Sequence, residues 1–157
     1  MQKIHPFLWF DGQAEEAMNF YVSVFKNSKV GSVTRYPKGS PGPEGQVMTA
    51  SFELEGQAFT ALNGGPMYKF SPAISLYVDC QSQDEVDRIW DRLLEGGQVQ
   101  ACGWITDKFG VTWQIIPEAL PRLMQDKNPK KAQAVMQAML KMKKIESKVL
   151  QEASDLA

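Results

Sequence analysis

The feature that most constrains the fold of this chain is an internal repeat. The segment PFLWFDG at residues 6–12 is matched by ISLYVDC at residues 74–80, with Leu8 in the position of Leu76. Both segments are short, apolar and rich in aromatic or β-branched residues, which is typical of buried strands. A chain that repeats itself at this spacing is predicted to contain two related folding modules.

The same helical pattern follows each of the two predicted strands. Apolar residues fall at positions i, i+3, i+4, i+7 and i+8 from Ala17 in the first repeat and from Val86 in the second. This spacing places them along one side of a helix. Ser82 and Glu85 form the S-x-x-E pattern that is typical of a helix N-terminus. Each repeat is therefore predicted to begin with a strand and a helix.

Further strands are predicted after each helix. They cover residues 30–37, 46–55 and 57–63 in the first repeat and residues 98–105 and 111–116 in the second. Glycines that suit hairpin turns, Gly56 and Gly110, occupy corresponding places before the last strand of each repeat. The sequence therefore predicts an α+β chain in which a strand, a helix and several strands occur twice.

Residues 118–157 depart from the repeat. Asn128 and Pro129 are preferred residues for the cap and the first position of a helix. From Ala132 to Val149, apolar residues recur every three or four positions, which predicts an amphipathic helix that is continuous or broken once. Its methionine-rich stripe is expected either to pack on the chain's own sheet or to cover a second subunit.

Composition excludes several classes of function. The chain has 157 residues, of which 43% are hydrophobic and 22% are charged, as in an ordinary globular domain. Its formal net charge of −1 gives no general attraction to nucleic acid or to anionic membranes. No stretch approaches the ~18 apolar residues of a membrane helix, and Asp11 interrupts the N-terminal segment too early for a signal peptide. We therefore expect a cytoplasmic protein with reduced thiols and no nucleic-acid or membrane partner.

These motifs resemble the PhnB-like branch of the vicinal oxygen chelate superfamily, which includes glyoxalase I, extradiol dioxygenases and bleomycin-resistance proteins. The resemblance implies two tandem βαβββ modules, 1–66 and 67–117, followed by the helical tail 118–157. It also implies that the sheets curl around a ligand cavity and that the protein is a homodimer. The stretches that carry the resemblance are 6–25, 52–66, 73–80, 102–117 and 134–145.

The label attached to this branch, 3-demethylubiquinone-9 3-methyltransferase, implies an activity that the residues do not support. A Rossmann-type methyltransferase needs a glycine-rich turn between a strand and a helix. Gly64-Gly65 is followed by a proline, and Gly96-Gly97 ends a predicted helix instead of starting one. The strand–helix junctions at Asp11-Gly12 and Asp79-Cys80 contain no such turn. We expect no methyltransferase activity.

Metal-dependent relatives hold a divalent ion with four side chains, two from each module. The resemblance implies that these positions are His5, Ala73, Gln114 and either Thr60 or Ala61 in this chain. One imidazole and one neutral amide are too few ligands for zinc, nickel or iron(II), which take three or four nitrogen, sulfur or charged oxygen ligands. We therefore expect neither a catalytic metal nor another cofactor.

The remaining candidates are aromatic and polar groups on the predicted strands. A cavity lined by apolar groups with a few polar anchors is the usual small-molecule site. Trp113 and Gln114 are adjacent on one strand and so point to opposite faces, which means that only one of them can line such a cavity. The residues that we expect at the site are His5, Trp9, Asn63, Cys102, Trp104 and Gln114. Because no base is predicted beside Cys102, we expect its thiol to be inert.

Three functions stay open at this point. The first is a small-molecule binder without a catalytic metal, of the sequestering kind found among bleomycin-resistance proteins. The second is a metal-dependent enzyme of the glyoxalase or dioxygenase type that uses other ligands. The third is a module that binds a partner through its tail. The sequence identifies neither the ligand nor a reaction.

Overall fold

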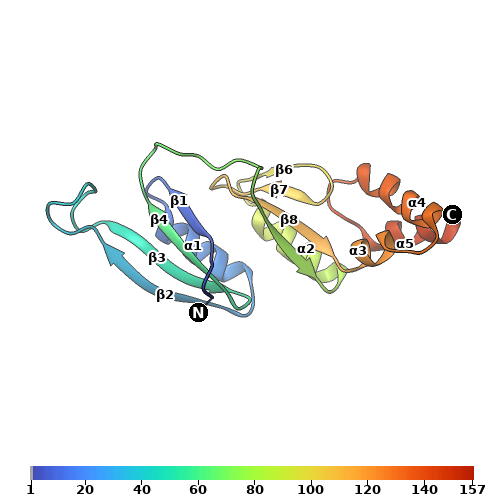
Figure 1. The fold of residues 1–157 in the computed structure, drawn as a ribbon, viewed down its shortest axis with the longest axis horizontal. Coiled ribbons are helices and arrows are strands. Elements are labelled where there is room, and N and C mark those ends of the chain that lie inside the picture. Colours follow the sequence, from blue (N-terminus) through green and yellow to red (C-terminus); the bar gives the residue numbers. More distant parts are fainter. Residues whose placement is uncertain (1) are drawn as a thin grey trace. The chain divides into compact units, whose positions relative to one another are not determined.

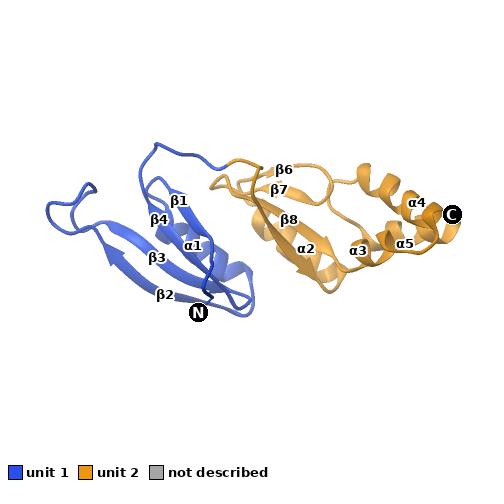
Figure 2. Cartoon of the chain, in the orientation of Figure 1, with its two compact units in different colours: residues 1–70 blue, residues 71–157 orange. Residues whose placement is uncertain are grey.

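The computed structural model of the protein describes residues 2–157, which form two compact units divided between Phe70 and Ser71 (Figure 2). Each unit contains a four-stranded mixed sheet with a helix against one face (Figure 1). The second unit also contains the helices of the tail. The predicted α+β fold with two tandem βαβββ modules and a C-terminal helical tail is confirmed.

In the first unit, the sheet has the strand order β1-β4-β3-β2, and β1 runs parallel to β4. Helix α1 packs on one face of this sheet, where Tyr21 and Phe52 are buried and Phe52 stacks on Phe59 with 5.4 Å between ring centroids. The elements are β1 (Phe7–Phe10), α1 (Ala14–Val24), β2 (Ser28–Arg35), β3 (Val47–Leu54) and β4 (Gln57–Asn63).

The second sheet repeats this plan with the order β5-β8-β7-β6 and with β5 parallel to β8. Ser82 accepts a hydrogen bond from the Glu85 amide at 3.1 Å, so the predicted N-terminus of α2 is confirmed. The elements are β5 (Ser75–Cys80), α2 (Gln83–Leu94), β6 (Gln98–Val99), β7 (Trp104–Thr106) and β8 (Thr112–Pro117).

The single strand predicted over residues 98–105 is wrong, because two short strands, β6 and β7, occupy this range. Cys102 and Gly103 both have positive φ, at 59° and 84°, and turn the chain between the two strands. A positive φ is rare for a residue other than glycine. The tail stabilises this turn, since the Cys102 and Gly103 amides donate to the carbonyls of Met142 and Lys143 at 2.9 and 2.7 Å.

A buried carboxylate shapes the longer turn between β7 and β8. Asp107 is 3% exposed, and its Oδ1 accepts hydrogen bonds from the Phe109 and Val111 amides. Its Oδ2 accepts from the indole Nε1 of Trp113 at 2.8 Å. Because a buried charge needs such partners, Asp107 fixes the turn and holds Trp113 against the side of the sheet that α2 covers.

The tail forms three helices: α3 (Ala119–Met124), α4 (Pro129–Leu140) and α5 (Ser147–Leu156). The amide of Lys130 donates to Asn128 Oδ1, which confirms the predicted helix start, and the amphipathic segment is broken once, between α4 and α5. Its apolar stripe packs on the chain's own second unit. The buried residues of this cluster include Ile116, Leu120, Leu123, Val135, Ile145 and Leu150. No helix within residues 2–157 is long and apolar enough to cross a membrane.

Gln83 ties the tail to α2. Its Nε2 donates to the Ile145 carbonyl at 2.9 Å, and its Oε1 accepts from the Ser147 amide at 2.8 Å. Asp87, one turn later, pairs with Lys144 at 2.9 Å, and hydrogen bonds from Lys144 and Gln83 lower the pKa of Asp87. The first turn of α2 therefore holds the segment that leads into α5.

Replacing Gln83 with alanine should loosen α5 without unfolding the second sheet. The loss of both hydrogen bonds to the tail is expected to lower the free energy of local opening of α5 by about 1–2 kcal/mol. Amide exchange in α5 should then be roughly 5–30-fold faster than in the unsubstituted protein. Hydrogen–deuterium exchange measures this, with the exposed neighbour Gln81→Ala as the control. Equal acceleration in β8 and α5 would contradict a local role for Gln83.

Candidate functional site

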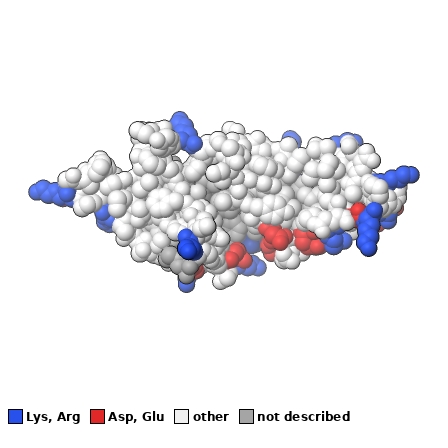
Figure 3. All heavy atoms as spheres, in the orientation of Figure 1, with Lys and Arg blue, Asp and Glu red and all other residues white. Residues whose placement is uncertain are grey.

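Each sheet has one face covered by its helix and a second face that no helix of the same module covers, which we call the open face. Neighbouring residues of a strand point to opposite faces. Ile105, Trp113 and Ile115 are buried on the side of α2, so Thr112 and Gln114 belong to the open face. In the view of Figure 1, the second sheet lies in front of α2, and the space-filling view shows mostly uncharged surface there (Figure 3).

The first row of the second sheet's open face consists of three hydroxyl groups. Ser75 on β5 and Thr106 on β7 flank Thr112 on β8 in direct cross-strand register. We call Ser75, Thr112 and Thr106 the hydroxyl row. Ser75 Oγ accepts a hydrogen bond from Gln114 Nε2 at 2.9 Å, and Thr106 Oγ1 accepts from Gln100 at 3.2 Å. The row can therefore offer further hydroxyl protons to a bound group.

The second row places an amide between two aromatic side chains. Tyr77 on β5 and Trp104 on β7 both lie in register with Gln114 on β8. We call these three residues the aromatic row. The Tyr77 side chain is 54% exposed, while Trp104 and Gln114 are half-buried. Desolvation, followed by the charge of Asp79, raises the pKa of Tyr77, so its phenol is neutral near pH 7.

One charged group belongs to this face of β5, β7 and β8. Asp79 follows Tyr77 on the same side of β5 and is exposed, whereas the corresponding position of β8 is Ile116, which the tail buries. The tail therefore closes the end of the open face beyond the aromatic row. A ligand on the two rows would meet hydroxyl, amide and aromatic groups next to a single carboxylate.

The first sheet uses its open face differently. His5 Nε2 lies 3.1 Å from Thr60 Oγ1, and Trp9 Nε1 donates to the Gly65 carbonyl at 2.8 Å. The ring of Tyr68 meets Trp9 edge-on with 4.9 Å between centroids, and a Cβ added at Gly64 would collide with the indole. The segment after β4 therefore rests on Trp9 and occupies this side of the indole.

The structure places the six predicted site residues in four different locations. Trp104 and Gln114 lie together on the open face of the second sheet, and His5 and Trp9 lie on that of the first. Asn63 takes part in the fold instead, because its Oδ1 accepts from the Ala14 amide at the start of α1 and its Nδ2 donates to the Val47 carbonyl. Cys102 lies in the turn before β7, with its amide bound to the tail. Whether any of the six binds a ligand stays a prediction.

The strand register corrects one predicted correspondence between the modules. Because Leu8 corresponds to Leu76, Trp9 corresponds to Tyr77. Trp9 pairs with Leu62, and Tyr77 pairs with Gln114, so Leu62 is the counterpart of Gln114. The prediction of Thr60 or Ala61 was wrong because it counted from the turn glycines. The turn before β8 is longer than the Glu55-Gly56 turn before β4, which shifts the count.

The donor atoms at the positions of a metal site do not fit a metal. After this correction the positions hold His5, Leu62, Ala73 and Gln114, which amount to one imidazole and one neutral amide. Among residues 2–157, His, Cys, Asp and Glu form no group of three or more that could hold an ion. Zinc and iron(II) sites need more and stronger ligands than these residues supply.

Neither the position nor the protonation of Cys80 suits nucleophilic catalysis. Its side chain is fully buried at the end of β5, and desolvation, with the charges of Glu85 and Asp79, raises the pKa of the thiol to about 12. The thiolate is the reactive form of cysteine, so this thiol is unreactive near neutral pH.

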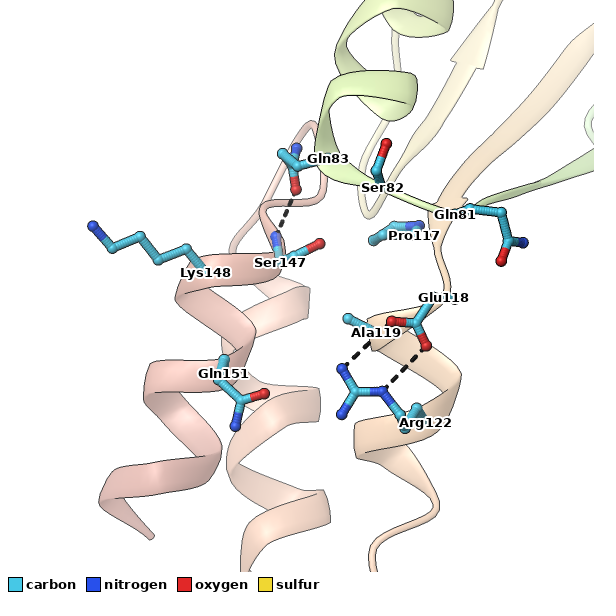
Figure 4. Close-up of a pocket in the computed structure, with 10 residues that line it drawn as sticks. All are labelled: Gln81, Ser82, Gln83, Pro117, Glu118, Ala119, Arg122, Ser147, Lys148 and Gln151. Carbon is cyan, nitrogen blue, oxygen red and sulfur yellow. Dashed lines mark hydrogen bonds and ion pairs between the residues drawn. The ribbon is translucent and has the colours of Figure 1, made fainter.

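A separate pocket of about 300 Å³ lies where the carboxyl ends of β5 and β8 meet the tail (Figure 4). Four of its lining residues already bind one another: Arg122 pairs with Glu118 at 3.1 Å, and Gln83 Oε1 accepts a hydrogen bond from the Ser147 amide. None of the six predicted residues lines it. The lining residues are Gln81, Ser82, Gln83, Pro117, Glu118, Ala119, Arg122, Ser147, Lys148 and Gln151. The pocket therefore lies where α2 and the tail pack together.

Sequence reasoning missed Ser75, Tyr77 and Thr112. Two signals point to them. The repeat aligns Tyr77 with Trp9, and the two-residue period of a strand places Thr112 on the same side as Gln114. Ser75 required knowledge of which strands are neighbours, because its contact with Gln114 joins β5 to β8. The pocket depends on the packing of the tail, for which the sequence carries no local signal.

Comparison with known proteins identifies similar chains. Residues 2–116 match the family model described as 3-demethylubiquinone-9 3-methyltransferase. A PhnB protein from Bacillus cereus that carries the same name is 41% identical, covers 74% of this chain and 99% of its own, and superposes with a TM-score of 0.68. A protein from Pseudomonas aeruginosa is 25% identical, with coverage of 75% and 98% and a TM-score of 0.63. No curated protein matches the chain.

A more distant likeness concerns the fold alone. The fosfomycin resistance protein FosX from Listeria monocytogenes, in a complex with Mn(II) and sulfate, is 16% identical, covers 72% of this chain and 90% of its own, and has a TM-score of 0.53. The family model ends at residue 116, before α3. The predicted resemblance over 134–145 therefore lies outside the matched residues.

A methyl group at Gly64 should destabilise the first unit. The added Cβ would collide with the Trp9 ring, and overpacking of this kind is expected to cost about 1–3 kcal/mol in the free energy of unfolding, measured by urea denaturation. In a Trp9→Leu background, Gly64→Ala should cost less, since the ring is gone. The same cost in both backgrounds would show that Trp9 is not the obstacle.

Proposed function

Because the chain belongs to the 3-demethylubiquinone-9 3-methyltransferase family, a PhnB-like family of the glyoxalase, bleomycin resistance and dioxygenase superfamily, we propose that it binds a small molecule without a catalytic metal. The site is the open face of the second sheet, and the aromatic row carries this assignment. Trp104 and Gln114 were expected at the site from the sequence, and Tyr77 completes the row.

The spacing of the aromatic row suits a flat group. Neighbouring strands lie about 4.8 Å apart, so the strands that carry Tyr77 and Trp104 are separated by roughly 10 Å, with the Gln114 amide between them. A planar ring can lie over the amide and contact either aromatic side chain. Stacking of this kind contributes about 0.5–1.5 kcal/mol beyond the burial of area. An exposed aromatic ring beside polar anchors is a usual feature of a binding surface.

The charges on the open face favour a ligand without negative charge. Asp79 is the one charged residue among the open-face positions of β5, β7 and β8 in the part of the chain that the structure describes. A carboxylate or phosphate placed on the rows would be repelled by Asp79 and would find no cation there. The amide and the hydroxyl row instead supply neutral hydrogen-bonding groups.

The metal-dependent alternative receives no support from the ligand positions. FosX is described with Mn(II). In this chain, the positions that the family resemblance implies for metal ligands hold one imidazole, one amide, a leucine and an alanine. Methyl transfer is also not proposed, since neither strand–helix junction contains a glycine-rich turn. The proposed activity is therefore binding, with no reaction assigned.

We further propose that the protein is a homodimer, as the superfamily resemblance implies. Large apolar side chains at the start of the chain support an interface, since Ile4 is 87% and Phe7 58% exposed. Light scattering during size exclusion should report twice the chain mass of 17.6 kDa. A single-chain mass at micromolar concentration would contradict this assignment.

A neutral aromatic compound should stabilise the protein through the aromatic row. With benzamide as the probe, a tenfold excess over its Kd is expected to add about 1.4 kcal/mol to the free energy of unfolding, detected by a thermal shift. Tyr77→Leu and Trp104→Leu should each reduce this shift. Tyr68→Leu is the matched control, because Tyr68 is 61% exposed but lies in the first unit.

The chelator EDTA separates metal-free binding from metal-dependent binding. The thermal shift from benzamide should be the same without EDTA and with EDTA at about 1 mM, a concentration about a hundredfold above that of the protein. A shift that EDTA abolishes, or that Tyr68→Leu reduces as strongly as Tyr77→Leu, would contradict the proposed site.

A further inference from the structure

Two hydroxyl groups within residues 2–157 are buried without a hydrogen-bond partner: Ser28 Oγ and Thr112 Oγ1. Buried polar groups in proteins are nearly always paired, because an unpaired one loses its contacts with water and gains nothing in return. Ser28 begins β2 in the first unit, whereas Thr112 is 1% exposed in the centre of the hydroxyl row. The unpaired hydroxyl of Thr112 is thus buried beneath the proposed ligand surface, in the middle strand of the hydroxyl row.

The hydroxyl groups on either side of Thr112 already accept hydrogen bonds from glutamine side chains. Gln100 donates to Thr106 Oγ1 on one side, and Gln114 Nε2 donates to Ser75 Oγ on the other. The Gln114 side chain therefore reaches from the aromatic row into the hydroxyl row, beside Thr112. Rotation of this half-buried side chain away from Ser75 would release the Ser75 hydroxyl, and we expect a ligand to reach the Thr112 hydroxyl through this movement.

Two hydroxyl protons then become available to one acceptor. Ser75 and Thr112 are in direct register on neighbouring strands, and each hydroxyl can donate one hydrogen bond. A carbonyl oxygen has two lone pairs and can accept from both. A carboxylate also has oxygen atoms that accept hydrogen bonds, but it would bring a negative charge to a face whose one charged residue is Asp79.

We propose that Thr112 is a specificity-determining residue that binds the carbonyl oxygen of an uncharged aromatic ligand, such as an aromatic amide or ketone. The ring of the ligand lies on the aromatic row, and its carbonyl group points to Thr112 and Ser75. This inference rests on the proposed function, because it assigns a chemical class to the ligand of the same site. The unpaired hydroxyl in the free protein is paired in the complex.

Binding of benzamide and benzoate to the full chain tests this inference, with affinities from saturation-transfer NMR titrations. Thr112→Val keeps the shape of the side chain and removes the hydroxyl, and it should weaken benzamide about tenfold. Thr112→Ser keeps the hydroxyl and should bind within about twofold of the unsubstituted protein. Ser28→Ala removes the other unpaired hydroxyl and should leave the affinity unchanged. Benzoate should bind at least about tenfold more weakly than benzamide.

Thermal unfolding of the free variants gives a second readout. Because Thr112→Val removes an unpaired buried hydroxyl, its midpoint should equal or exceed that of the unsubstituted protein. A lower midpoint would mean that the hydroxyl is already paired and would overturn the inference. Equal benzamide affinities of the Val variant and the unsubstituted protein would also overturn it while leaving the proposed function in place. Failure of benzamide to bind the unsubstituted protein would overturn both.

Discussion

The parallel pairing of β5 with β8 is the interaction on which the rest of the second unit depends. This register sets Tyr77 beside Gln114 and Ser75 beside Thr112, and it directs Trp113 toward α2. A slip of one residue would turn every side chain of β8 to the other face. It would place Gln114 among the apolar residues under α2, and the Trp113 indole would lose its buried partner Asp107. Core packing and the candidate site are therefore specified by the same pairing.

The two modules share this pairing but use their open faces differently. Trp9 and Tyr77 occupy equivalent positions, yet Trp9 is engaged by Gly65 and Tyr68, whereas Tyr77 remains more than half exposed. The difference arises from the segment that follows the last strand of each module. After β4 the chain lies against the indole at Gly64, and after β8 it enters α3 and builds the tail core on Ile116. The second module therefore keeps Tyr77 of its aromatic row exposed, whereas the equivalent Trp9 of the first module is covered.

Local patterns in the sequence predicted the elements, and long-range contacts determined what the sequence missed. The stripe from Val86 and the cap at Ser82 were sufficient for α2, because they involve contacts within one or two helical turns. The break at Cys102 required the tail carbonyls that accept from Cys102 and Gly103, some forty residues away. Gln114 corresponds to Leu62 instead of the predicted Thr60 or Ala61, because the turns before β4 and β8 differ in length. Trp104 and Gln114 came from the sequence, whereas the unpaired Thr112 hydroxyl required the packed structure.

Backbone amide chemical shifts recorded during a benzamide titration locate the ligand most directly. If the open face of the second sheet is the site, the largest changes will fall in residues 75–79, 104–106 and 112–116, which carry the hydroxyl and aromatic rows. The tail residues 118–122 and 147–151, which line the pocket of Figure 4, should change little. Changes that concentrate in those tail residues or in the first unit, with β5, β7 and β8 unaffected, would contradict the account.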